Sequence, residues 1–259
     1  MESLLQFEGL VLLAIVAVML FAGLVHGTLG LGFPMVATPI LATMMDVRSA
    51  ILVTLIPTMA VNIASIYRGE ASMEAVKPFL PMVWFTLLGS IAGASILALT
   101  DPAPFRIVLA GLILIYLSST YIARIPPHWL NAKPLMAMAL FGICAGISGG
   151  TTNVMVAILI IYFLSLETSR AVMVPVLNSC FLVGKFSQIV VLAIAGFVSI
   201  GLVMETIPLA LAAVGALLLG QRLQKRIRVK TYQGILRKLL VLLAVILIVQ
   251  FFNETGVFR

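Results

Sequence analysis

The residues best placed to do chemistry are polar groups inside apolar stretches of the chain. Lys185 lies deep in such a stretch, between Asn178 and Gln188. A charge inside a membrane segment is costly and is by default a sign of function, and a lysine would supply the positive charge for an anion. The alternatives for Lys185 are a carboxylate partner or a stem that reaches the membrane edge. Asn62, Asn178 and Gln188 predict either substrate contacts or hydrogen bonds between helices.

Two glycine-rich stretches interrupt apolar runs at matching places in the two halves of the chain. The first is His26-Gly-Thr-Leu-Gly-Leu-Gly-Phe-Pro34, and the second is Gly146-Ile-Ser-Gly-Gly-Thr-Thr-Asn153. When Gly27 is aligned with Gly146, Gly30 falls on Gly149, and a short apolar helix follows each break. The chain therefore reads as a duplication. Broken helices at corresponding positions of two halves point to the binding site of a transporter.

The breaks have the chemistry of an anion site. The first turn of a half-helix offers free N–H groups and the positive end of the helix dipole. Glycine lets the backbone approach a ligand closely. Hydroxyl and amide side chains at the breaks would add donors. In the alternative interpretation, the glycines only allow helices to pack closely. The predicted substrate-binding residues are Gly27, Thr28, Gly30, Gly32, Phe33, Pro34, Asn62, Ser148, Gly149, Gly150, Thr151, Thr152, Asn153, Asn178, Lys185 and Gln188.

Two further titratable residues are candidates for carrying a coupling proton. His26 could titrate near neutral pH, although a buried histidine beside a break is more often a structural donor. Glu205 lies inside an apolar run and could carry a proton or pair with Lys185. A rival hypothesis is an intramembrane protease, because Gly146-Ile-Ser-Gly149 matches the short GxSG pattern of rhomboids, with Ser148 as nucleophile and His26 as base. In rhomboids the histidine follows the serine, whereas here it precedes it.

The composition is that of an integral membrane protein. Hydrophobic residues make up 62% of the chain and charged residues 10%, against about 25% in soluble domains. The net charge of +7 does not indicate nucleic acid, because the basic residues gather in one segment, 221–238. Beside a membrane helix such a cluster marks the cytoplasmic face. Cys144 and Cys180 lie in apolar runs and predict neither a disulfide nor a metal site. We expect no cofactor, no metal and no catalytic residues.

The apolar runs predict an all-α membrane protein with two repeats, 1–123 and 135–259, joined by a linker at 124–134. Each repeat would hold a glycine-broken, re-entrant hairpin followed by about three spans. The expected half-helices are 34–45 and 154–164, and the expected full spans are 49–67, 78–99, 105–122, 171–195, 198–219 and 239–252. This arrangement places most of the 16 Lys and Arg residues on one face. It makes the repeats inverted, with both termini outside.

Both breaks and the helix after each, Arg48-Ser-Ala-Ile-Leu-Val-Thr54 and Ser169-Arg-Ala-Val-Met-Val-Pro175, resemble the sulfite exporter TauE/SafE family of membrane permeases. The resemblance covers nearly the whole chain. It differs at Leu31 and at Thr151-Thr152-Asn153, where relatives carry further glycines. The resemblance implies movement of sulfur-containing anions such as sulfite, sulfonates, sulfoacetate or thiosulfate across the bacterial inner membrane, often outward.

Together these observations predict a secondary transporter, most simply an exporter, of a small sulfur-containing anion that works by alternating access. No P-loop pattern for ATP is present. The expected partners are the anion and the lipid bilayer, and a homodimer is left open. The alternatives are the rhomboid-like protease and a membrane assembly factor without transport activity.

Overall fold

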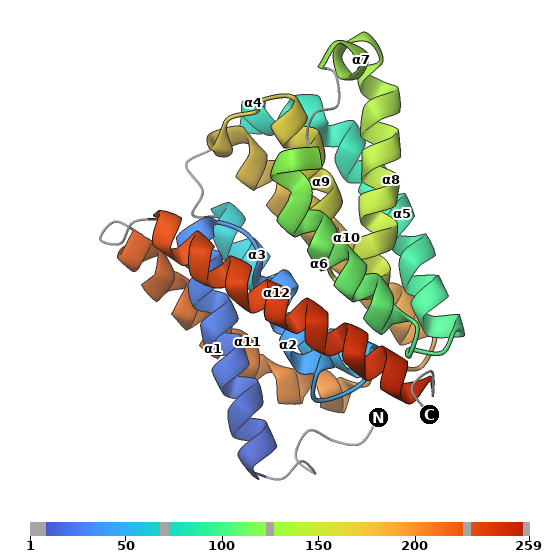
Figure 1. Ribbon diagram of the computed structural model, residues 1–259, viewed down its shortest axis with the longest axis vertical. Coiled ribbons are helices and arrows are strands. Elements are labelled where there is room, and N and C mark those ends of the chain that lie inside the picture. Colours follow the sequence, from blue (N-terminus) through green and yellow to red (C-terminus); the bar gives the residue numbers. More distant parts are fainter. Residues whose placement is uncertain (1–8, 68–72, 123–126, 225–228, 256–259) are drawn as a thin grey trace.

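The computed structural model describes residues 9–67, 73–122, 127–224 and 229–255. Every regular element in these ranges is a helix, as the sequence predicts (Figure 1). The first half holds α1 (Gly9–Leu29), α2 (Phe33–Ala42), α3 (Val47–Tyr67), α4 (Met73–Val76), the 3-10 turn η2 (Lys77–Phe79), α5 (Leu80–Leu99) and α6 (Phe105–Ile122). The second half holds α7 (Pro127–Ala132), α8 (Pro134–Thr152), α9 (Val156–Ser165), α10 (Arg170–Ile194), α11 (Ile200–Gln224) and α12 (Val229–Glu254).

Seven helices in the described ranges are long and apolar enough to cross a membrane. They are α1, α3, α5 together with η2, α8, α10, α11 and α12. The two short helices expected after the breaks are α2 and α9, with 10 residues each. At 1.5 Å per residue each is about 15 Å long, which is half of a membrane crossing. Pro34 lies in the first turn of α2, where its missing N–H costs nothing.

The breaks are shorter than the sequence predicted. Helix α1 continues through Leu29 and α8 continues through Thr152, so most of the glycines expected in the breaks lie inside helices. The first break contains Gly30 and Gly32, whose φ angles are 78° and 105°. The second break is centred on Asn153, with φ of 67°. Asparagine is among the few residues besides glycine that adopt this left-handed conformation readily, which explains how α8 ends without a glycine there.

Other helix boundaries also differ from the prediction. The basic segment 221–238 is largely helical, because α11 continues through Gln224 and α12 begins at Val229. Residues 225–228 lie outside the described ranges. The linker 124–134 contains α7 and the start of α8, while its first residues lie outside the description. Pro57, Pro175 and Pro208 lie inside α3, α10 and α11 without ending them.

Each broken helix packs against a helix of the other half. Helix α1 packs on α11, and α8 packs on α5. Glycines allow both contacts: a Cβ at Gly27 would lie 2.2 Å from the carbonyl oxygen of Leu217, and one at Gly146 would lie 2.3 Å from that of Thr86. No side chain fits at these distances. The glycines of the broken helices therefore allow the two halves to pack closely.

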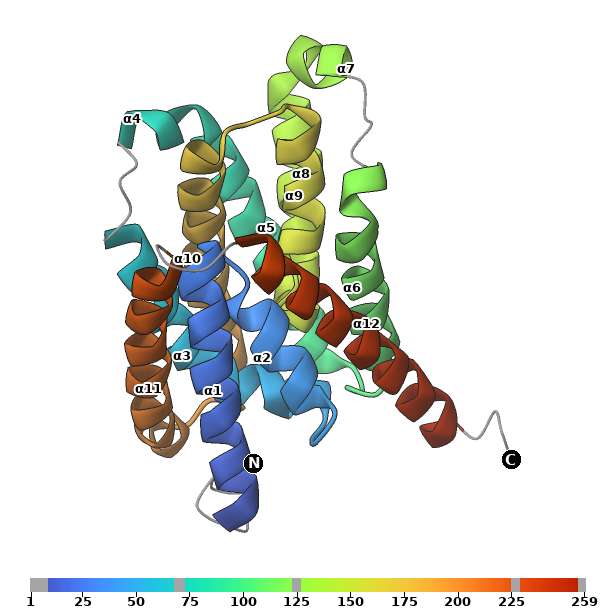
Figure 2. The ribbon, with the colours of Figure 1, turned by 60° about the vertical axis from the view of Figure 1, so that its left-hand side comes forward.

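The main remaining helix contacts also come in matching pairs: a contact made by a helix of one half is repeated by the corresponding helix of the other half. Helix α5 packs on α10 as α11 packs on α3, and α6 packs on α9 as α12 packs on α2. Helices α3 and α10 pack on each other, as do α6 and α12. In Figure 2, α1 rises through the molecule while α8 descends. The short helices α2 and α9 each fold back beside the broken helix that precedes them.

Candidate substrate-binding site

The centre of the candidate site is Lys185, in the second half of α10. Its side chain is 1% exposed, although it carries a formal charge. The ammonium group donates hydrogen bonds to Oδ1 of Asn153 and Oε1 of Gln188. Both partners are neutral amides. The side chain is buried inside the protein, and these bonds do not pair it with a carboxylate. Neither of the two structural explanations that the sequence left open is therefore supported.

Asn153 connects this lysine to the first half of the chain. Its backbone N–H closes the end of α8 on the carbonyl of Gly149, at 3.0 Å. Its side-chain amide donates to Oγ1 of Thr38 on α2, at 2.9 Å, and of Thr54 on α3, at 3.0 Å. One asparagine thus joins four elements at the second break: α8, α2, α3 and α10.

Gln188 completes the cluster from the next turn of α10. Its amide nitrogen donates to the carbonyl of Gly150 at 2.8 Å, and also lies 3.5 Å from that of Gly149. The structure therefore brings together five predicted site residues: Gly149, Gly150, Asn153, Lys185 and Gln188. Thr38 and Thr54 belong to the same cluster and were not predicted. The sequence did contain a signal for them, because Thr38 is a polar residue within the predicted half-helix and Thr54 is one within the span that follows.

The first break has different chemistry from the second. The N–H of Phe33, in the first turn of α2, donates to Nδ1 of His26 at 3.2 Å. Nε2 of His26 lies 2.9 Å from Oγ of Ser65 on α3, so a neutral ring protonated at Nε2 satisfies both contacts. This amide, which we expected to face a ligand, is instead capped by the chain. His26 has the geometry of a structural residue.

Carbonyl groups at the first break point toward donors on α10. The guanidinium of Arg170 donates to the carbonyls of Leu29 and, at 3.4 Å, Thr28. The side-chain amide of Asn178 donates to the carbonyl of Gly30 at 3.2 Å. A cation at the carboxyl end of α1 is favourable, because the helix dipole is negative there. Helix α10 therefore binds both breaks, the first through Arg170 and Asn178 and the second through Lys185 and Gln188.

The predicted hydroxyl donors are used within their own helices. Thr28 donates to Val25, and Ser148 donates to Ala145 at 2.9 Å. Thr151 and Thr152 donate to carbonyls one turn earlier, each at 2.8 Å. Such bonds are the usual way for a hydroxyl to be satisfied inside a helix. Ser148 and His26 have separate partners, and no hydrogen bond joins them, so a serine–histidine pair is not supported.

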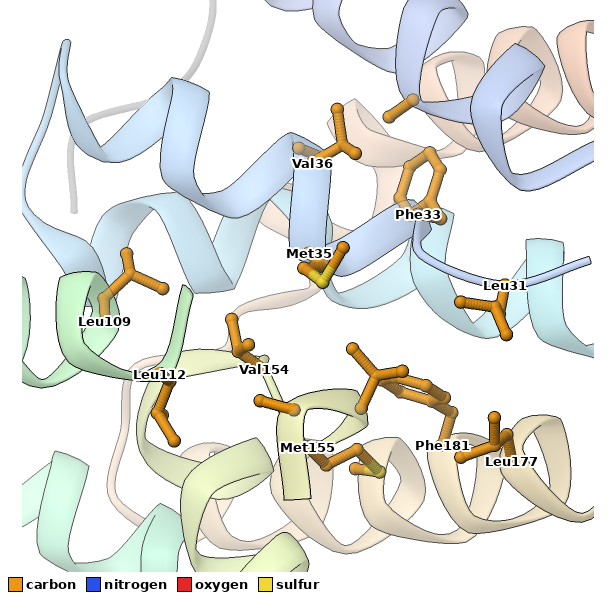
Figure 3. Close-up of a cluster of buried hydrophobic side chains, with 14 of the residues drawn as sticks. Leu31, Phe33, Met35, Val36, Leu109, Leu112, Val154, Met155, Leu177 and Phe181 are labelled. Carbon is orange, nitrogen blue, oxygen red and sulfur yellow. The ribbon is translucent and has the colours of Figure 1, made fainter. Parts of the chain in front are cut away.

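Apolar side chains gather between the two breaks, where the sequence predicted a polar site. Figure 3 shows Leu31, Phe33 and Met35 from the first break and α2 near Val154 and Met155 from the second and Phe181 from α10. All six are buried, with exposures of 6% or less. In this conformation Lys185 is shielded from solvent, with an exposure of 1%.

A few buried polar atoms have no hydrogen-bond partner among the described residues. They include both amide atoms of Asn62 and the hydroxyl of Thr58, on neighbouring turns of α3, and Oδ1 of Asn178 on α10. Glu205 is half-buried on α11, and neither hydrogen bond of Lys185 goes to it. Asn62 and Glu205 thus lie outside the Lys185 cluster, and Asn178 belongs to the first break.

Comparison with known proteins identifies the family. The family model described as sulfite exporter TauE/SafE matches residues 15–251, nearly the whole chain. No match was found among curated protein sequences or among solved structures. The family consists of membrane permeases for sulfite and related sulfur anions, in agreement with the all-helical architecture and its seven candidate spans. The chain belongs to the sulfite exporter TauE/SafE family.

Proposed function

We propose that this protein is a secondary transporter that exports a small sulfur-containing anion, such as sulfite, sulfoacetate or another sulfonate, across the bacterial inner membrane. The observation that carries the proposal is Lys185. It is a buried ammonium in a membrane helix, and its hydrogen bonds go to neutral oxygens. The family supplies the chemical class of the anion.

Neutral amides only partly replace the water that a buried ammonium has lost. Leaving a buried charge without a counter-charge costs several kcal/mol, about 3–5 by measurements on broken ion pairs. An oxyanion bound at Nζ would supply the missing charge. Its oxygens would replace the amide oxygens of Asn153 and Gln188 as acceptors of the Lys185 N–H groups.

The arrangement of the two halves supports alternating access. The opposite directions of α1 and α8 and the exchange of helix contacts fit inverted repeats, with α2 and α9 as re-entrant half-helices. The proposed repeats are 1–123 and 135–259. Rocking of one half against the other would open the apolar layer around Phe33 and Met155 first toward one face and then toward the other. In this orientation the basic segment 221–238 is cytoplasmic and both termini are outside.

The test is anion flux into liposomes that contain the purified protein. Wild-type protein is expected to move sulfite or a small sulfonate, and Lys185→Gln is expected to lose this flux. The control is Lys133→Gln, because Lys133 is exposed at the start of α8 and the change in net charge is the same. Flux retained by Lys185→Gln would remove the lysine from the mechanism. Absence of flux for every sulfur anion with wild-type protein would contradict the proposed function.

A further inference from the structure

Lys185 is the one formally charged side chain among the buried residues of the described ranges. The other buried polar groups in its cluster are hydroxyls and amides: Thr38, Thr54, Asn153 and Gln188. Helix α5, which packs against α10, contributes Ser90, whose hydroxyl donates to the carbonyl of Gly184 at 2.9 Å. The cluster therefore carries at most a single positive charge.

The donors of the cluster set a second limit. An ammonium has three N–H groups, and Lys185 uses two of them on Asn153 and Gln188. Both N–H groups of the Asn153 amide are used on Thr38 and Thr54. The hydroxyl of Thr54 donates within its own helix to the carbonyl of Ala50, at 2.9 Å. The site therefore holds few groups that could stabilise a second negative charge.

From this charge count we propose that the site selects singly charged oxyanions, meaning hydrogensulfite or a monosulfonate, and discriminates against dianions such as sulfate or sulfoacetate. The inference rests on the proposed function and narrows its substrate class. One monoanion beside one ammonium makes a neutral pair. A dianion would leave one negative charge without a partner in the membrane interior. That charge costs enough to weaken binding about 100-fold, from the penalty for a charged group at the membrane centre.

The test compares two ligands of nearly equal size that differ by one charge. These are 2-hydroxyethanesulfonate, a monoanion, and sulfoacetate, a dianion at neutral pH. Each is added as a competitor of sulfite flux in liposomes that contain wild-type protein. We expect the monoanion to compete about 100-fold better. Equal competition would overturn the charge rule while leaving the proposed function intact. Absence of sulfite flux without any competitor would instead count against the proposed function.

Variants that change the charge of the cluster test the same rule from the protein side. Asn153→Asp places a fixed negative charge beside Lys185, and asparagine and aspartate both accept the left-handed backbone found at this position. We expect this variant to lose sulfite flux itself, because the added carboxylate neutralises the one positive charge of the cluster. Gln188→Lys adds a second positive charge and should shift the preference toward sulfoacetate, whereas Gln188→Met, which removes the amide without adding charge, should not. An unchanged preference in folded Gln188→Lys protein would contradict the inference.

Discussion

Replacing Gly146 by alanine tests how the two halves are held together. The added Cβ would lie 2.3 Å from the carbonyl oxygen of Thr86 and 2.6 Å from the backbone nitrogen of Ser90. Both atoms belong to the backbone of α5, so no side-chain rotation relieves the overlap. Ordinary contact begins near 3.4 Å, so α5 and α8 must separate by about 1 Å. Overpacking of this kind costs about 1–3 kcal/mol, partly offset by the better helix propensity of alanine.

The assay is thermal unfolding of the purified protein in detergent, followed by tryptophan fluorescence. For a chain of this size, a loss of about 2 kcal/mol lowers Tm by about 4–8 °C. The control is Gly111→Ala on α6, where a Cβ would meet no atom within 4 Å. This variant should be as stable as wild type or slightly more stable. Gly27→Ala on α1 should behave like Gly146→Ala, because its Cβ would meet α11 at 2.2 Å. Equal Tm values for Gly146→Ala and Gly111→Ala would refute the packing argument.

Three further changes test individual residues. Asn62→Leu should stabilise the fold by about 1–3 kcal/mol in the same unfolding assay, because both of its amide atoms are buried without a partner, and a lower Tm would contradict this. His26→Ala should destabilise it by about 1–3 kcal/mol, because the buried N–H of Phe33 loses its acceptor, while His128→Ala at an exposed position should leave Tm unchanged. Arg170→Gln should cost about 1 kcal/mol through loss of a cation at the carboxyl end of α1, and addition of salt should reduce the difference from wild type, whereas a difference that salt leaves unchanged would exclude the electrostatic explanation.

Much of the fold could be predicted from hydropathy alone. The long apolar runs predicted most of the full-length helices to within a few residues, although α12 begins ten residues before the predicted span 239–252. The two short helices were expected at α2 and α9. The helix ends were less predictable, because glycine signals either a break or close packing. Gly146 and Gly150 are packed against α5 within a continuous helix, while Asn153, without any glycine run after it, ends the helix. Only the tertiary contact with α5 shows whether a glycine marks a helix break or a close contact between helices.

The candidate site was predicted in part. Lys185 was singled out because a charge in an apolar run is expensive. Asn153 followed from its place in the second break, and Gln188 was selected as a polar group in the same apolar run as Lys185. Thr38 and Thr54 were missed, because a threonine in an apolar helix is usually satisfied by its own backbone. The hydroxyls of Ser148 and Thr152, which the sequence predicted as substrate donors, are bonded within their own helix in this conformation. The capping of Phe33 by His26 depends on a turn geometry that residue spacing does not reveal.

The most direct test of the central claim is calorimetric binding of 2-hydroxyethanesulfonate to wild-type protein, Lys185→Gln and Lys133→Gln. Binding requires neither transport nor a known direction of flux. We expect saturable binding by wild-type protein and Lys133→Gln, and affinity about 100-fold weaker in Lys185→Gln, because a charge-assisted hydrogen bond is lost. Folding of each variant is checked by its unfolding transition. Binding of equal affinity in folded Lys185→Gln protein would contradict the account.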